Sequence, residues 1–166
     1  MATITLQGNE INTNGDLPSV GSTAADFHLV DVDLADRHLA DYEGKKKLLN
    51  IVPSLDTGVC ATSTKHFNEV LSGRDDLAVL VISADLPFAS GRFCTEEKVG
   101  GVTALSMMRS RNFAKDYGVL ITDGPLAGVT ARAVIVLDES NKVVYTELVP
   151  EIAQEPDYES AIKALG

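Results

Sequence analysis

The chain has 166 residues, 45% of them hydrophobic, which is enough for one globular domain with a substantial core. Its formal net charge of −10 argues against nucleic acid or an anionic membrane as a partner, because binding to phosphate needs clustered Lys and Arg. The longest apolar run, Leu77 to Ile82, is much shorter than the ~20 residues of a membrane-spanning helix, so no membrane association is expected.

The N-terminal residues lack the basic start and apolar stretch of a secretory signal. We therefore expect a cytoplasmic protein, where thiols are kept reduced and a pair of cysteines is more often redox-active than structural. The only basic run, residues 45–47, precedes an apolar segment and predicts a solvated strand edge or turn rather than a phosphate site.

Strand and helix patterns alternate along the chain, without repeats or a long linker. Apolar residues flank Gly8-Asn9, a pair suited to a two-residue turn, so residues 1–15 are expected to form an N-terminal β-hairpin. The elements expected after it are strands at 25–32, 48–52, 77–83 and 102–105, helices at about 60–73, 87–98 and 110–117, a hairpin of strands 133–137 and 143–148, and a terminal helix opened by Pro156.

This order predicts the α/β fold class, with a mixed central sheet, helices on its faces and the N-terminal hairpin as a small extension. Residues 1–166 are expected to form a single domain.

The segment P-S-L-D-T-G-V-C, residues 53–60, places one of only two cysteines in the first turn of a predicted helix, with Thr57 as a candidate N-cap. Unpaired backbone N–H groups at a helix start favour an anion, which biases Cys60 toward the nucleophilic thiolate. A helix terminus contributes at most ~2 kcal/mol, so a strongly reactive thiolate also needs a cation. Arg132 stands at the entrance to an apolar strand, a position equally compatible with a structural salt bridge and with this functional role.

Four segments carry a resemblance: P-S-L-D-T-G-V-C, S-A-D-L-P-F-A-S-G-R-F-C, D-G-P-L-A-G-V-T-A-R-A-V and E-P-D-Y-E. In this order and spacing they resemble the bacterial thiol peroxidases, the atypical two-cysteine branch of the peroxiredoxins. The resemblance covers nearly the whole chain and implies a thioredoxin-like fold. The chain has no C-x-x-C, and Thr57 stands where a dithiol oxidoreductase would carry its second cysteine, which disfavours a disulfide isomerase.

The resemblance implies roles for five residues. Cys60 would attack the peroxide and become a sulfenic acid, and Cys94 would condense with it to form an intramolecular disulfide. Thr57 would hydrogen-bond the thiolate and the peroxide, Arg132 would stabilise the charge across the breaking O–O bond, and Pro53 would shield the sulfur. No cofactor or metal is expected, because the histidines have no credible ligand spacing with the cysteines.

A disulfide requires Cα atoms within ~7 Å, which is demanding for cysteines on two different helices. Gly91, one turn before Cys94, and the Gly100-Gly101 pair after it predict a segment that unwinds easily. The resemblance also implies thioredoxin as the electron donor, a hydroperoxide substrate with a leaning toward alkyl hydroperoxides, and a homodimer. A competing hypothesis is a redox-regulated binding module with a thioredoxin fold, in which the cysteines only switch its shape.

Overall fold

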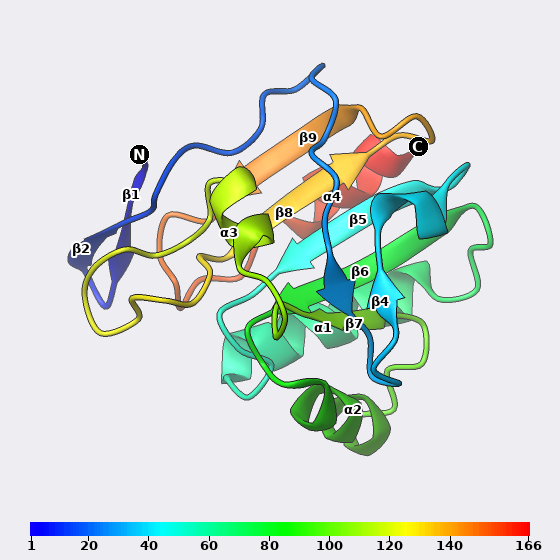
Figure 1. Cartoon of the computed structure of the whole chain (residues 1–166), viewed down its shortest axis with the longest axis horizontal. Helices are drawn as coiled ribbons and strands as arrows, with labels where there is room; N and C mark the ends of the chain where they lie inside the picture. Colours follow the sequence, from blue (N-terminus) through cyan, green and yellow to red (C-terminus); the bar gives the residue numbers. More distant parts are fainter.

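Seven strands form one mixed sheet in the computed structural model, which describes residues 1–166 (Figure 1). The strands are β3 (Leu29–Val30), β4 (Asp36–Arg37), β5 (Lys46–Ile51), β6 (Leu77–Ser83), β7 (Thr103–Ser106), β8 (Ala133–Leu137) and β9 (Val143–Leu148). They lie in the order β4-β3-β7-β6-β5-β8-β9. The central strands β5, β6 and β7 are parallel, and the other neighbouring pairs are antiparallel, which confirms the predicted mixed sheet.

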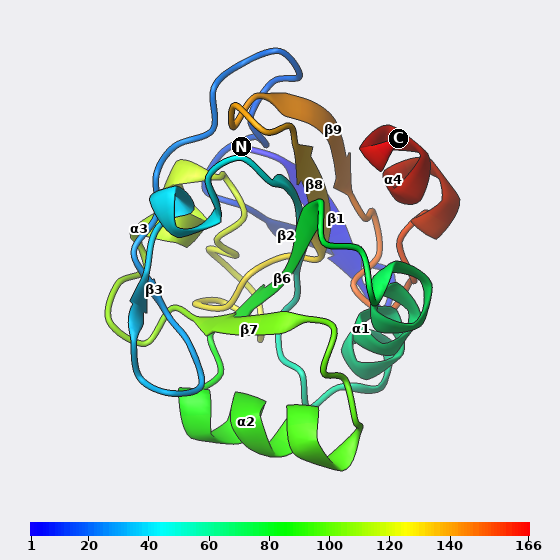
Figure 2. The same cartoon turned by 90° about the vertical axis from the view of Figure 1, so that its right-hand side faces the viewer.

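Helices cover both faces of this sheet. They are α1 (Gly58–Leu71), α2 (Pro87–Glu96), α3 (Asn112–Asp116) and α4 (Tyr158–Leu165), with a 3-10 turn, η1 (Leu39–Tyr42). Helices α1 and α4 lie together on one face and α3 lies on the other, while α2 packs beside β7 (Figure 2). None of these helices combines the length and the apolar character needed to cross a bilayer.

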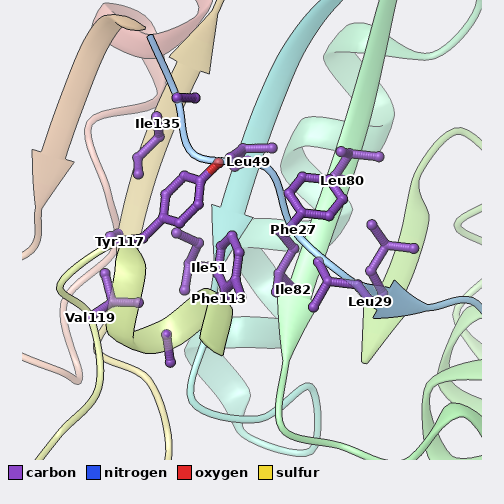
Figure 3. Close-up of a cluster of buried hydrophobic side chains, with 14 of the residues drawn as sticks. Phe27, Leu29, Leu49, Ile51, Leu80, Ile82, Phe113, Tyr117, Val119 and Ile135 are labelled. Carbon is purple, nitrogen blue, oxygen red and sulfur yellow. The ribbon is translucent and has the colours of Figure 1, made fainter. Parts of the chain in front are cut away.

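The larger apolar core fills the α3 face of the sheet (Figure 3). Leu49 of β5, Leu80 of β6 and Ile135 of β8 are fully buried there against the stacked rings of Phe113 and Tyr117. Successive side chains of a strand point to opposite faces of the sheet. The residues next to these three along their own strands therefore face α1 and α4 instead. Burial on both faces explains why β6 and β8 read as continuous apolar runs in the sequence.

The N-terminal hairpin consists of β1 (Thr3–Leu6) and β2 (Asn9–Asn12), whose register pairs Ile4 with Ile11. Its turn is Gln7-Gly8, one residue before the predicted Gly8-Asn9. Both turn residues have positive φ, 52° and 80°, as the favoured type of two-residue hairpin turn requires. The hairpin was therefore predicted correctly, but its turn was misplaced because Asn9 already pairs with Leu6 in the ladder.

Two further predictions need correction. The strand expected at 25–32 shrinks to β3, which pairs with the unpredicted β4 across a turn closed by the Asp31 carboxylate, an acceptor for the N–H groups of Asp33 and Ala35. Residues 46 and 47 belong to the central strand β5 rather than to a solvated edge. Lys47 is completely buried, and its ammonium donates to the side-chain amide oxygen of Asn141, which replaces part of its lost hydration.

A single carboxylate ties the hairpin to the segment that follows β9. Glu151 accepts hydrogen bonds from the Thr5 hydroxyl and from the N–H groups of Gln7, Gly8 and Ala153. These bonds, led by that of Thr5, lower the pKa of Glu151 from 4.5 to about 2. The folded state therefore favours the ionised carboxylate.

We expect Glu151 to stabilise the fold in a pH-dependent way. Because its folded pKa is depressed, its contribution is present above pH 4.5 and is lost as the pH falls from 4.5 toward about 2. The difference in unfolding free energy between the wild type and Glu151→Gln should be constant at neutral pH and shrink below pH 4.5, as measured by denaturant titration. A difference that does not vary with pH would contradict this account.

Candidate active site

Cys60 lies in the first turn of α1, as predicted, with Thr57 at the N-cap. The N–H groups of Gly58, Val59 and Cys60 have no hydrogen-bond acceptor, because the first intrahelical bond runs from the Ala61 N–H to the Thr57 carbonyl. Three donors at the positive end of the helix dipole are thus free to face an anion. The Cys60 carbonyl, in contrast, accepts from the hydroxyls of two residues further along α1, Ser63 and Thr64.

The Cys60 side chain is completely buried in an apolar cluster. Val52, Leu55, Val81 and Ala104 surround it: the first two belong to the loop between β5 and α1, and the others to β6 and β7. Removal of an anion from water is costly unless charge or hydrogen-bond donors replace the lost hydration. The surroundings of this thiol must therefore supply hydrogen-bond donors or positive charge if it is to act as a thiolate.

Arg132 is a candidate source of that charge. It is 1% exposed and forms no ion pair, so the structure contradicts the salt-bridge alternative for this residue. Its Nε donates to the carbonyl of Ile152 at 2.9 Å. Its Nη1 is buried without any partner, an unusual state for a guanidinium nitrogen.

The sheet places Arg132 next to the loop that carries Cys60. The β5–β8 ladder ends with Ile51 opposite Ala133, so the next step in the same register brings Val52 opposite Arg132. The Thr130 hydroxyl still donates to the Val52 carbonyl at 2.8 Å, which shows that the two segments stay adjacent there. Strand alternation directs Arg132 to the same face as Val134, the face covered by α1.

The loop before α1 is held by Asp85, a residue whose role the sequence analysis missed. Its carboxylate accepts from the Ser54 hydroxyl and from the Leu55 N–H, both at 2.7 Å, and from the Ser83 hydroxyl at 2.8 Å. Asp85 lies in the quoted motif S-A-D-L-P, but its two partners in the loop, Ser54 and Leu55, are 31 and 30 residues away, so only the folded chain reveals its function as an anchor.

Pro53 and Thr57 occupy opposite ends of this loop. Pro53 is buried, two residues after the end of β5. Thr57 is exposed, and its hydroxyl donates to the Ser54 carbonyl at 3.0 Å. A groove of about 610 Å³ opens beside Thr57, between the start of α1 and helix α2, with Ala61 and Phe93 on its two walls.

Cys94 lies on α2 and borders the same apolar cluster as Cys60. It is half-buried, and burial raises the pKa of its thiol. Both cysteines are free thiols. The fold therefore brings five predicted site residues to one region, with Cys60 and Cys94 beside a shared cluster and Arg132, Pro53 and Thr57 around the start of α1.

The site has no metal-binding cluster. No group of three or more His, Cys, Asp or Glu side chains is arranged to hold a metal ion. Of the histidines, His28 and His38 stack on each other and His66 stacks on Tyr158.

Comparisons with known proteins give a consistent result. The family model described as Redoxin matches residues 19–162. A thiol peroxidase of Corynebacterium glutamicum is 50% identical over 166 residues, covering 100% of both chains, and one of Leptospira interrogans is 50% identical over 166 residues, covering 99% of this chain and 97% of the relative.

Solved structures agree with these relatives. A peroxiredoxin-like protein from Aquifex aeolicus superimposes with a TM-score of 0.94 at 41% identity, covering 99% of this chain and 96% of its own. A thiol peroxidase from Chromobacterium violaceum gives a TM-score of 0.91 at 29% identity, with the same coverage of 99% and 96%.

Proposed function

The chain belongs to the redoxin family and is a peroxiredoxin enzyme of the thiol peroxidase type, and on this premise we propose that it reduces hydrogen peroxide and alkyl hydroperoxides through Cys60 and Cys94, with thioredoxin as its reductant. The observation that carries this assignment of residues is the buried, unpartnered Nη1 of Arg132 on the face of the sheet that α1 covers.

In the first step, the Cys60 thiolate attacks one oxygen of the hydroperoxide and the O–O bond breaks. The sulfur becomes a sulfenic acid, and the leaving alkoxide or hydroxide takes a proton to give an alcohol or water. The three free N–H groups at the start of α1 stabilise the thiolate. Arg132 stabilises both this anion and the negative charge that develops on the leaving oxygen.

Substrate entry involves the other two residues of the site. Leu55 and Phe93 line the groove beside Thr57 and also pack in the apolar cluster of Cys60, which supports this groove as the route of the substrate. Thr57 turns its hydroxyl from Ser54 to the peroxide when the substrate binds. Pro53, packed between Val52 and the anchored loop, keeps bulk water from the sulfur. Exclusion of water strengthens the electrostatic interactions within the site.

In the second step, the Cys94 thiol attacks the sulfenic sulfur of Cys60. The S–S bond forms and the hydroxyl of the sulfenic acid leaves as water, taking the thiol proton. Thioredoxin then reduces this disulfide by exchange, which returns two thiols and leaves thioredoxin oxidised. The shared apolar cluster beside both cysteines supports this pairing, and α2 unwinds around Cys94 to let the two sulfurs meet.

Arg132→Met is expected to slow Cys60 oxidation by at least about tenfold, because a buried anion then loses its cationic partner. The alkylation rate of Cys60 should shift to higher pH, since the thiolate is less stable without the guanidinium. Iodoacetamide labelling of Cys94→Ser protein across a pH series measures this directly. Methionine matches the length of the arginine stem and keeps its packing.

The matched control is Arg74→Met. Arg74 is paired with Asp76, beyond the last turn of α1, and should leave Cys60 reactivity unchanged. If Arg132→Met gave the wild-type pH profile and oxidation rate, Arg132 would have no part in the site.

Three expectations stay predictions. They are a homodimer, a cytoplasmic location and the treatment of residues 1–166 as one domain. Analytical ultracentrifugation at several protein concentrations would test the first of these.

A further inference from the structure

The segment that follows β9, residues 149–152, lies between the N-terminal hairpin and Arg132. On one side, the Val149 N–H donates to the Arg132 carbonyl at 3.0 Å, and the Arg132 Nε donates to the Ile152 carbonyl at 2.9 Å. This bond to Ile152 is the only hydrogen bond of the Arg132 guanidinium. The position of that carbonyl therefore decides where the unpartnered Nη1 points.

On the other side, the same segment is bound to the first strand of the hairpin. The Thr5 N–H donates to the Pro150 carbonyl at 2.8 Å, and the Ile152 N–H donates to the Thr5 carbonyl at 2.9 Å. Figure 1 shows the hairpin beside the end of β9, where this segment begins. Thr5 and Arg132 thus contact the two sides of one short stretch of backbone.

Glu151 fastens this contact. Its Oε2 accepts from the Thr5 hydroxyl at 2.6 Å and from the Gly8 N–H at 3.2 Å, and its Oε1 accepts from the N–H groups of Gln7 and Ala153 at 3.0 and 3.2 Å. The carboxylate thereby joins the hairpin turn to the residue that follows Ile152.

Apolar packing couples the same parts. Ile4 and Ile11 of the hairpin form a buried cluster with Ala131 and Ile152. Ala131 is the chain neighbour of Arg132, and Ile152 is the residue whose carbonyl accepts the hydrogen bond of Arg132. The hairpin therefore restrains both ends of the Arg132 to Ile152 interaction.

We propose that Glu151 is a positioning residue for the peroxidase reaction, which locks the first strand of the hairpin onto residues 149–152 and so aims the Arg132 guanidinium at the Cys60 site. The inference rests on the proposed role of Arg132. Catalysis depends on placement of charged groups to within a fraction of an ångström, and an error of ~1 Å far from the chemistry can cost ~100-fold in rate. The N-terminal hairpin is then part of the active-site scaffold rather than an appendage.

The test uses the full chain with Glu151→Gln. Each carboxylate oxygen of Glu151 accepts two hydrogen bonds, and in glutamine one of these oxygens is replaced by NH₂, which is itself a donor. Two donors then lose their acceptor, so residues 149–152 shift while the fold is retained. We expect Cys60 oxidation by hydrogen peroxide to slow by about tenfold, and the pH profile of Cys60 alkylation to move upward as in Arg132→Met. A purely structural role would leave that profile in place.

Thr5→Val is a second variant that keeps the side-chain shape and removes a single donor to Glu151. It should show a smaller change in the same direction, and it tests the inference even if Glu151→Gln does not fold. The matched control is Asp123→Asn. Asp123 accepts from the N–H and the side-chain amide of Asn12 and so fastens the second strand of the hairpin, away from residues 149–152. It should leave Cys60 reactivity unchanged.

The double variant Glu151→Gln/Arg132→Met gives the decisive result. If Glu151 acts through Arg132, the double variant should oxidise at the rate of Arg132→Met alone, so the two effects are not additive. Additive effects, an equal loss in Asp123→Asn, or wild-type rates in both Glu151→Gln and Thr5→Val would each overturn the positioning role. If Cys60 oxidation is slow in Arg132→Met but has the wild-type rate in Glu151→Gln, this inference alone is overturned. If Cys60 oxidation has the wild-type rate in Arg132→Met, the proposed role of Arg132 is overturned as well.

Discussion

Replacement of Cys60 by serine is expected to abolish peroxide turnover and to leave the fold intact. A serine hydroxyl is not ionised at neutral pH, and without a thiolate there is no nucleophile for the O–O bond. The volumes of the two side chains are similar, although a hydroxyl in the apolar cluster around residue 60 costs some stability. Peroxide consumption in the presence of thioredoxin, thioredoxin reductase and NADPH measures the activity, and thermal unfolding checks the fold.

Cys94→Ser is the matched control for this experiment, because it removes the other thiol and keeps Cys60. When one equivalent of peroxide is supplied per chain, Cys94→Ser should still consume it, since the sulfenic acid forms before Cys94 takes part. If Cys60→Ser kept substantial turnover, the peroxidatic role would have to move to Cys94 or to an unidentified group.

Loss of Cys94 is also expected to stop recycling by thioredoxin. Without a resolving thiol, the Cys60 sulfenic acid persists and a second peroxide oxidises it to the sulfinic acid, which thioredoxin does not reduce. Mass spectrometry after repeated peroxide addition should show overoxidised Cys60 in Cys94→Ser and a disulfide in the wild type. Normal recycling of Cys94→Ser by thioredoxin would contradict the resolving role.

The disulfide is expected to form within one chain and to unwind α2. Closure of a loop of about 35 residues restricts the unfolded chain by ~4 kcal/mol in the entropy model, which can offset the lost packing of this helix. Oxidised wild type should run as a monomer on non-reducing denaturing gels. Its amide exchange should be faster from about Pro87 to Gly100 than in the reduced form, whereas a covalent dimer would indicate pairing between subunits.

The sequence allowed the central elements to be predicted because their signals are local. The apolar run at 77–83 became β6 with the predicted bounds, and the helical spacing after Cys60 became α1. The short β4 carried no such signal, since two polar residues, Asp36 and Arg37, pair only because the chain turns back around Asp31. The apolar stem of Lys47 is buried and its ammonium bonds to Asn141, in the turn between β8 and β9, which the charge of the residue alone does not reveal.

In the candidate site, too, features with a local signal could be predicted and features that depend on distant segments could not. The helix start at Cys60 and the exceptional position of Arg132 were visible in the sequence. The lack of an ion partner for Arg132 and its single bond to Ile152 were not visible there, because they depend on packing between distant segments. Asp85 and Glu151 were missed for the same reason: the Glu151 carboxylate binds Thr5, which is 146 residues away in the chain.

The measurement that tests the central claim most directly is the number of peroxide equivalents that one chain consumes. Wild-type protein, supplied with the thioredoxin system and with hydrogen peroxide or an alkyl hydroperoxide, should consume many equivalents per chain and should lose this turnover in Cys60→Ser. Consumption that stops after about one equivalent, with both cysteines oxidised and thioredoxin present, would contradict a recycled peroxidase and favour a redox-regulated binding module.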